Sequence, residues 1–405
     1  MQRQFVRSER AHFMCPNMHF GIRMALDTAY DPEKLQKTVQ DLAAAHPFLR
    51  SVIAEDDAGA LYYRVTAESQ ILVAVREDVF ALWADWKSLS QEDWNVFENG
   101  LLKLFVYPQE AGMTVLFAAH HLLTDGRGLL DLAQEFANDY TKGIVPAYAE
   151  EVLIESIGDL PEKSALAGMS RWLVKRMNRL WKKEGRTVSY ETYRRFAAEY
   201  GRTHPVEYES YTVGADQVAQ MLQTSRENGF SVNDLLMAEM YLRSGAEKII
   251  IAADIRDRFP KYQKGAMGNY STAMGIVCKP KSANVTEVAK QVHALVQKHR
   301  GSNRSLMLVL ACYFEMDPAL LDAAAISALG GFGSKSAQFV GGGMFGFARP
   351  KSHSLTNLGR VENENIRTLQ FIPPASPAAK FTLGVVTLNG TLYACSSKNT
   401  WAYKT

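Results

Sequence analysis

Alternating apolar and polar positions predict β-strands in both halves of the chain. In the first half, strands are expected over residues 20–30, 48–53, 61–65, 70–75, 101–107 and 114–119. In the second half, they are expected over residues 208–213, 249–253, 275–278, 381–388 and 391–396. Residues 108–112 contain Pro and Gly and predict an antiparallel hairpin, and Asn389-Gly390 predicts a tight hairpin turn.

Apolar residues at three- and four-residue spacing predict helices between these strands. One helix begins after Asp31, a good N-cap, has Pro32 in its first turn and ends before His46-Pro47. Further helices are expected over 215–228, 231–241 and 285–298, and one begins near Leu129. The glycine-rich stretch 330–346 is expected to be irregular. The mixture of elements predicts an α/β (α+β) fold.

The pattern changes between residues 144 and 205. Between Ser170 and Pro205 there are ten Lys or Arg residues and three Glu residues, which gives this stretch a charge of about +7. Leu173, Met177, Leu180 and Trp181 share one face of a helix there. We therefore divide the chain into an N-terminal subdomain (1–145), a basic connecting segment with one amphipathic helix (146–205) and a C-terminal subdomain (206–405).

Composition and charge narrow the class of protein. The chain has 405 residues, 47% hydrophobic and 22% charged, with a net charge of +2, which gives no indication of nucleic-acid binding. The four cysteines are scattered singly and predict neither a disulfide framework nor a metal site. The longest uncharged apolar run is far shorter than the roughly 20 residues that span a bilayer. We expect a soluble, cytoplasmic protein.

The strongest chemical signal lies where residues 114–119 run into two histidines. His120-His121 is followed by Asp125-Gly126. An imidazole, with a pKa near ~6.5, is well suited to general-base work at neutral pH, and we assign that role to His121. Because neighbouring strand residues face opposite sides, His120 is expected to pack behind the site. For the same reason the two histidines are not expected to bind one metal ion.

The motif His120-His121-Leu122-Leu123-Thr124-Asp125-Gly126 resembles the HHxxxDG signature of the chloramphenicol-acetyltransferase-like superfamily. This group includes peptide-synthetase condensation domains and HxxxD, wax-ester and alcohol acyltransferases. Supporting segments resemble those of the family in the same order along the chain. They are His46-Pro47-Phe48-Leu49-Arg50, Ser231-Val232-Asn233-Asp234-Leu235-Leu236, Asp254-Ile255-Arg256, Gly268-Asn269 and Ser354-Leu355-Thr356-Asn357-Leu358-Gly359.

The resemblance implies two similar subdomains, with mixed and largely antiparallel sheets, around a central channel. It implies that His121 takes a proton from an acceptor hydroxyl or amine, which attacks a thioester. Asp125 would pair with Arg256, or less favourably with Arg258, and so hold the loop. Gly126 would supply the backbone freedom for the turn after this aspartate.

Two further expectations concern the oxyanion and the departures from the family pattern. Thr356 or Asn357 would donate a hydrogen bond to the oxyanion. Gly128 stands where many relatives have serine, which puts helix capping in doubt. Asp254 replaces the asparagine often found two positions before the arginine.

The implied co-substrate is acyl-CoA or the phosphopantetheine thioester of an acyl carrier protein, with no bound cofactor and no metal. The acceptor is a small alcohol or amine. A free-standing condensation domain that forms amides is one alternative. A catalytically inactive relative that binds a carrier protein is another. Residues 171–186 form either a solvated helix over the core or a docking site for an acidic carrier protein or an anionic lipid surface.

Two other motif readings are weaker. His120 and Asp125 also satisfy the HxxxxD spacing of membrane glycerolipid acyltransferases, but the sequence has no membrane segment and no downstream phosphate-binding motif to support it. Gly333-Ser334-Lys335-Ser336 lacks the Gly-Lys-Ser/Thr order of a P-loop.

Overall fold

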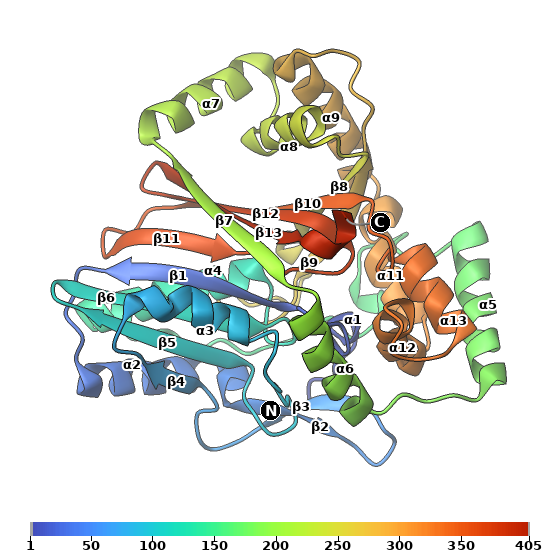
Figure 1. Ribbon diagram of the computed structural model, residues 1–405, viewed down its shortest axis with the longest axis horizontal. Helices are drawn as coiled ribbons and strands as arrows, with labels where there is room; N and C mark the ends of the chain where they lie inside the picture. Colours follow the sequence, from blue (N-terminus) through green and yellow to red (C-terminus); the bar gives the residue numbers. More distant parts are fainter. Residues whose placement is uncertain (1–2, 404–405) are drawn as a thin grey trace.

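The computed structural model describes residues 3–403, and its core is two stacked β-sheets with helices outside them (Figure 1). The first sheet has the order β11-β1-β6-β5-β4 (Ile366–Ile372, His19–Leu26, Gly112–His120, Leu102–Gln109, Leu72–Val75). The second has the order β7-β13-β12-β10-β8-β9 (Val206–Val213, Thr391–Asn399, Ala379–Leu388, Ser352–Val361, Lys248–Asp254, Ser271–Val277). A separate hairpin pairs β2 (Ser51–Glu55) with β3 (Leu61–Val65).

Most strand pairs are antiparallel, and three pairs are parallel: β4 with β5, and β10 with both β12 and β8. The expected mixed, largely antiparallel α/β architecture is therefore confirmed. Strand β11 comes from the C-terminal part of the chain but pairs with β1 in the first sheet. The sheets consequently do not follow the sequence boundaries at residues 145 and 206 throughout.

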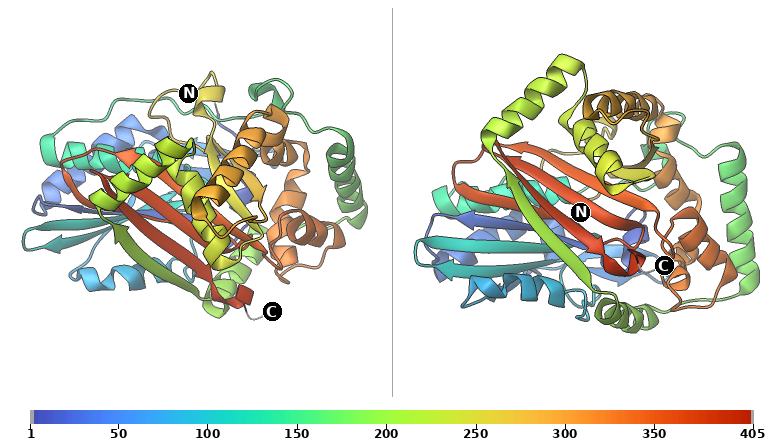
Figure 2. Two further views of the ribbon diagram at one scale, coloured as in Figure 1. Left: turned by 90° about the horizontal axis from the view of Figure 1, so that it is seen from above. Right: turned by 45° about the horizontal axis from the view of Figure 1, so that its top comes forward.

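Helices cover the outer faces of both sheets (Figure 2). The outer face of the first sheet packs against α2 (Pro32–Ala45) and α4 (Gly126–Lys142), whereas α3 (Leu82–Ser88) packs on its opposite face, beside residues of the second sheet. The second packs against α7 (Ala215–Asn228), α8 (Val232–Ser244) and α9 (Val285–Arg300). The remaining helices are α1 (Arg10–Phe13), α5 (Gly168–Glu184), α6 (Tyr190–Thr203), α10 (Asn303–Leu306), α11 (Leu308–Glu315), α12 (Pro318–Ala328) and α13 (Lys335–Gln338).

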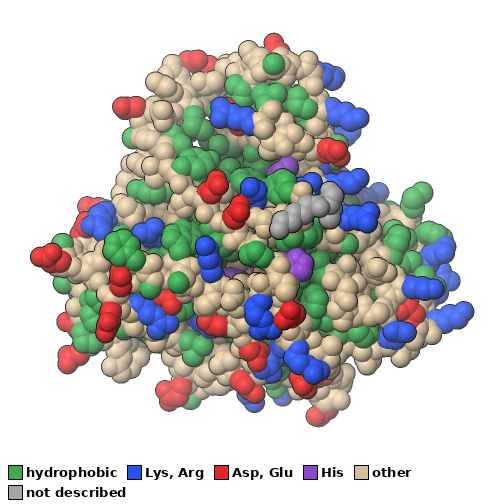
Figure 3. Space-filling view, in the orientation of Figure 1, with side chains coloured by type: hydrophobic (Ala, Val, Ile, Leu, Met, Phe, Trp, Pro, Cys, Tyr) green, Lys and Arg blue, Asp and Glu red, His purple; other side chains and the backbone are tan. Residues whose placement is uncertain are grey.

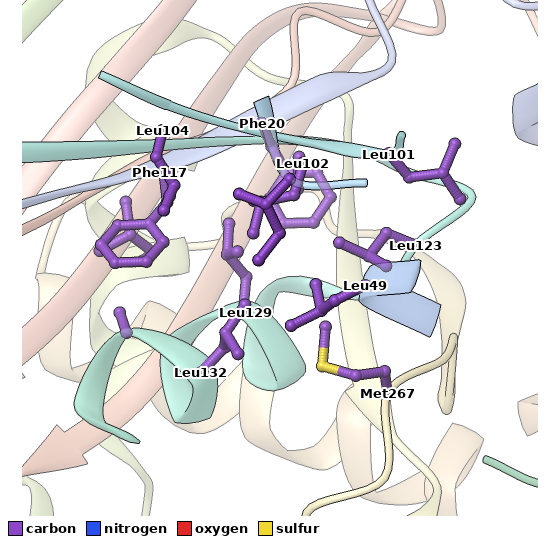
Figure 4. Packing of buried hydrophobic residues seen from close by; sticks show 14 of the residues in the cluster. Phe20, Leu49, Leu101, Leu102, Leu104, Phe117, Leu123, Leu129, Leu132 and Met267 are labelled. Atoms are coloured by element: carbon purple, nitrogen blue, oxygen red, sulfur yellow. The ribbon is translucent and has the colours of Figure 1, made fainter. Parts of the chain in front are cut away.

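The core that supports the histidine motif lies between the first sheet and α4. Figure 4 shows Phe20 and Phe117 from the strands facing Leu129 of α4, with Met267 reaching in from the second half of the chain. Phe117 and Leu129 are fully buried. Each such side chain stabilises the fold by roughly 1.5–3 kcal/mol, so the end of β6 is held on a rigid base.

Several predicted elements are confirmed with their local chemistry. Asp31 caps α2 by accepting hydrogen bonds from the N–H groups of Glu33 and Lys34. Strands β5 and β6 form the expected hairpin. Asn389 and Gly390 both have positive φ, at 47° and 83°, in the turn between β12 and β13, as a tight hairpin of this kind requires.

Three predictions are wrong. Residues 47–50 form a 3-10 turn rather than a strand, because Pro47 starts a turn in which Leu49 N–H donates to the His46 carbonyl. The basic segment contains two helices: Gly185 ends α5 with positive φ, and Ser189 caps α6.

The third concerns the glycine-rich stretch, which is helical rather than irregular over α13 and the π-helical turn η5 (Phe339–Met344). A Cβ on Gly341 would lie 2.0 Å from the Ala324 carbonyl oxygen. Glycine is therefore needed there for close helix packing.

Candidate functional site

The two histidines lie where β6 ends, and they serve opposite sides of the sheet. His121 N–H donates to the Met18 carbonyl beside β1, and His120 is paired in register with His19 of β1. The His121 side chain lines a cavity of about 320 Å³ that is bounded mainly by the second sheet, α1 and α11. His120 lines a different, smaller hollow. The predicted separation of the two side chains is confirmed.

Asn269 holds the His121 ring. The Nδ1 atom of His121 lies 2.9 Å from Asn269 Oδ1, and Asn269 Nδ2 donates to the His121 carbonyl at 2.9 Å. Because an amide oxygen only accepts hydrogen bonds, this contact places the proton on Nδ1 and leaves Nε2 as the basic nitrogen. Burial lowers the pKa of His121 below its ordinary value. The ring is therefore neutral, and able to accept a proton, at pH 7.

A third histidine, His12 of α1, stacks on His121. The two ring centroids are 4.1 Å apart and the planes are inclined by 16°. Burial, reinforced by repulsion from His121, lowers the pKa of His12 well below its ordinary value. The His121 ring also contacts Phe20, at 4.8 Å between centroids. The catalytic candidate is thus packed against two uncharged rings.

Asp125 and Arg256 form a buried bidentate ion pair, as expected. Arg256 Nη2 lies 2.8 Å from Asp125 Oδ1, and Nη1 lies 3.0 Å from Oδ2. Asp125 also accepts hydrogen bonds from the N–H groups of Gly128 and Tyr270. Burial alone would raise the pKa of Asp125, but Arg256 and these N–H groups bring it below its ordinary value. Both carboxylate oxygens of Asp125 are thus occupied by these contacts, which hold the loop in place.

Arg258, the weaker partner for Asp125, instead donates to Asn303. Asp254 accepts from both the backbone N–H and the Nη1 of Arg256. The residue that departs from the family asparagine therefore braces the same arginine.

Gly126, which ends the motif, and Gly128, two residues later, lie where a side chain has little room. Gly126 does not have positive φ, so its expected role in backbone freedom is wrong. A Cβ there would lie 2.8 Å from Leu358 Cδ2. A Cβ on Gly128 would lie 2.0 Å from the buried Thr124 Oγ1. Capping of α4 does not depend on residue 128, because Asp125 is the N-cap.

The His121 cavity is mainly apolar. Its wall includes residues from α1, α11, the end of η5 and the second sheet. Thr356 of β10 lines the cavity, whereas Asn357 is exposed and its Oδ1 accepts from the Gly359 N–H. Of the two oxyanion candidates, only Thr356 lines the His121 cavity.

His120 packs against Trp94 at 5.8 Å between ring centroids, and its Nδ1 accepts from the Leu122 N–H. Burial lowers the pKa of His120 to about 3.

Over residues 3–403, no group of three or more His, Cys, Asp or Glu side chains is arranged to hold a metal ion. In the same residues, no helix is both long enough and apolar enough to cross a bilayer.

The spacing of residues in the sequence did not identify Asn269 as the partner of His121. It also gave no indication that His12 stacks on His121. Asn269 is 148 residues from His121 along the chain. The Gly268-Asn269 pair gave the only available signal, through the family pattern.

Comparisons by sequence give local matches. No model of a protein family matches the sequence. Surfactin synthase subunits 1 and 2 of Bacillus subtilis are 32% identical to this chain over 120 and 133 residues. These alignments cover 28% and 31% of this chain, and they span only 3% and 4% of those much longer proteins.

Comparisons by structure cover nearly the whole chain. Trichothecene 15-O-acetyltransferase from Fusarium sporotrichioides matches with a TM-score of 0.65, at 11% identity, over 98% of this chain and 90% of that one. The epimerization domain from the third module of tyrocidine synthetase B gives a TM-score of 0.58 at 14% identity, over 98% and 88%. The first condensation domain of the calcium-dependent antibiotic synthetase gives 0.57 at 12%, over 100% and 92%. The chain therefore has the fold of condensation domains and chloramphenicol-acetyltransferase-like acyltransferases.

Proposed function

We propose that this protein is an acyltransferase that moves an acyl group from a thioester to a hydroxyl or amine acceptor, with His121 as the general base. The observation that carries the proposal is the His121 ring in an apolar cavity, with Nδ1 bound to Asn269 and Nε2 free. Neutral imidazole in this state accepts a proton from an acceptor as it attacks, an effect typically worth on the order of 10²–10⁴ in rate.

The proposed reaction has two proton transfers. The acceptor O–H or N–H gives its proton to Nε2 of His121 while its oxygen or nitrogen bonds to the thioester carbonyl carbon. The resulting oxyanion takes a hydrogen bond from Thr356 Oγ1. The C–S bond then breaks, and His121 returns the proton to the leaving thiolate. His121 returns the same proton that it accepts, so the net charge of the site does not change. Asp125 is therefore not required to move a proton.

The donor and the acceptor follow from the proposed chemistry. The thioester is acyl-CoA or an acyl group on the phosphopantetheine arm of a carrier protein, bound only as a co-substrate. The structural neighbours include an O-acetyltransferase and a condensation domain. The acceptor is therefore an alcohol in the ester-forming version of the proposal and an amine in the amide-forming version.

The test is His121→Ala assayed against a panel of acyl-CoA and acyl-carrier thioesters, with free thiol release as the readout. We expect a loss of at least about 10²-fold in turnover. His120→Asn serves as the matched change on the opposite side of the sheet and should lose much less. Turnover by His121→Ala near that of the unmodified protein would refute the mechanism.

A carrier-binding protein without catalysis is the competing function. It predicts that the unmodified chain binds an acyl carrier protein and releases no thiol from any thioester in the panel. Product analysis by mass spectrometry, with alcohol and amine acceptors supplied separately, decides between ester and amide formation.

A further inference from the structure

Helix α5 carries two faces, and only one of them belongs to the core. Val174, Met177 and Trp181 are buried against α11, α12 and α13. On the outer side, Met169, Trp172 and Leu180 are exposed by 82%, 52% and 39%. These three positions recur at helical spacing, so they form one apolar stripe that faces solvent. Because this exposed stripe contributes nothing to the core, its apolar side chains require an explanation other than the stability of the fold.

The exposed stripe borders a groove that continues onto a second element. Trp172, Leu180 and Phe339 line this groove between α5 and the start of η5. Phe339 is itself 45% exposed. Exposed large apolar side chains that gather in this way mark an interaction site more often than a free surface.

A row of cations flanks the apolar stripe. The basic side chains of α5 are Arg171, Lys175, Arg176, Arg179, Lys182 and Lys183. In the part of the chain that the structure describes, only Arg171 of these six has an ion-pair partner, which is Glu315. Figure 3 shows Lys and Arg side chains along the same outer edge of the molecule, where Figure 1 places α5. Five positive charges of this helix are left for an external anion.

We propose that the outer face of α5, with Phe339, docks the protein onto an anionic lipid surface. A helix with Trp, Leu and Met on one stripe and Lys and Arg beside it inserts its apolar side chains at the headgroup level, while its cations bind anionic headgroups. The face lies on the outer edge of the molecule (Figures 1 and 2), where a broad surface can reach it. An extended sheet of anionic headgroups complements the whole length of this row of cations.

Two elements connect the docking face with the wall of the His121 cavity. Phe339 begins η5, while Met344 at its other end lines the cavity. Helix α11 likewise contributes Tyr313 to the cavity and Glu315 to the contact with Arg171. Docking through α5 therefore brings an apolar wall of the cavity close to the lipid phase. The lipid-binding proposal itself does not depend on the proposed acyl transfer.

The test is co-sedimentation of the full chain with phosphatidylcholine vesicles that contain or lack phosphatidylserine. We expect binding only to the phosphatidylserine vesicles, and a decrease in binding as salt is raised. The triple variant Lys175→Gln/Arg179→Gln/Lys182→Gln should bind on the order of 100-fold more weakly. Trp172→Ala should weaken binding without changing its dependence on salt.

The matched control is Lys279→Gln/Lys281→Gln/Lys290→Gln, which removes the same charge from exposed lysines in and before α9. Melting temperatures check that every variant folds. Equal weakening by the control and by the α5 variant would overturn the proposal, because a general charge effect would then suffice. So would an absence of vesicle binding alongside binding of an acidic carrier protein that the α5 variant loses.

Discussion

At the scale of single residues, the chemistry of the site depends on what surrounds one imidazole. His121 could be identified from sequence because HHxxxDG is a compact motif with its members at fixed spacing. Asn269 and His12 could not be assigned roles in this way, because they approach His121 only through the fold. A hydrogen-bond partner 148 residues away has no spacing signal in a single sequence.

The state of His121 predicts the pH dependence of activity. Burial lowers its pKa below 6.5, and only the neutral ring accepts a proton. As the pH falls, turnover should therefore decline to half of its plateau value only below pH 6.5. The measurement is kcat/KM for thioester consumption between pH 4.5 and 8. A half-maximal point above pH 6.5 would contradict the assignment of the acidic limb to this ring.

At the scale of elements, the motif makes a fixed contact between the two halves of the chain. Asp125 caps α4, and its partner Arg256 follows β8 in the 3-10 turn η4 (Arg256–Arg258). Family order made this pair predictable, whereas the spatial role of the glycines was not. A single sequence does not show that Leu358 lies above Gly126 or that Thr124 lies beside Gly128.

Removing the charge from Asp125 should lower the stability of the fold more than it alters the chemistry of the site. The Asp125 and Arg256 side chains are only 5% and 10% exposed. Asp125→Asn leaves the Arg256 charge buried without its carboxylate partner. The variant should therefore lower the free energy of unfolding by about 3 kcal/mol. Chemical denaturation measures this loss.

Asp254→Asn is the matched control for that change. Asp254 also pairs with Arg256, but its side chain is 53% exposed. The expected cost is below about 1 kcal/mol, because solvent screens exposed pairs. An unchanged unfolding free energy for Asp125→Asn, together with abolished turnover, would instead make Asp125 a participant in the reaction.

At the scale of the whole molecule, helices and hairpins were predicted better than the arrangement of the sheets. Hydrophobic spacing and caps such as Asp31 are local, and the elements that they specify formed as expected. Pairing of β11 with β1 joins residues more than 300 positions apart. No local pattern in residues 366–372 distinguishes that partner from a strand of the second sheet.

A buried carboxyl makes stability of the whole fold depend on pH. Glu9 is fully buried, and burial raises its pKa from 4.5 to about 7. The folded state therefore binds this proton more tightly than the unfolded state, and stability should fall as the pH rises from 4.5 to 7. Glu9→Gln should raise the free energy of unfolding at pH 8 by roughly 1–3 kcal/mol and leave it unchanged at pH 4.

The comparison for Glu9→Gln is Glu68→Gln, which alters an exposed carboxyl. It should change stability little at either pH. Denaturant titrations of both variants at pH 4 and pH 8 separate the two cases. Equal unfolding free energies of Glu9→Gln and the unmodified protein at pH 8 would show that the buried carboxyl carries no penalty.

The pairing of β11 with β1 also has a consequence for the order in which the protein is made. During synthesis, β1 emerges early, yet the strand that covers its outer edge is complete only at residue 372. Until then the nascent chain presents a mostly apolar strand with unpaired backbone groups, a form prone to join other chains. Protection of this edge of β1 by a chaperone until residue 372 has been made is thus an expected requirement of its biosynthesis.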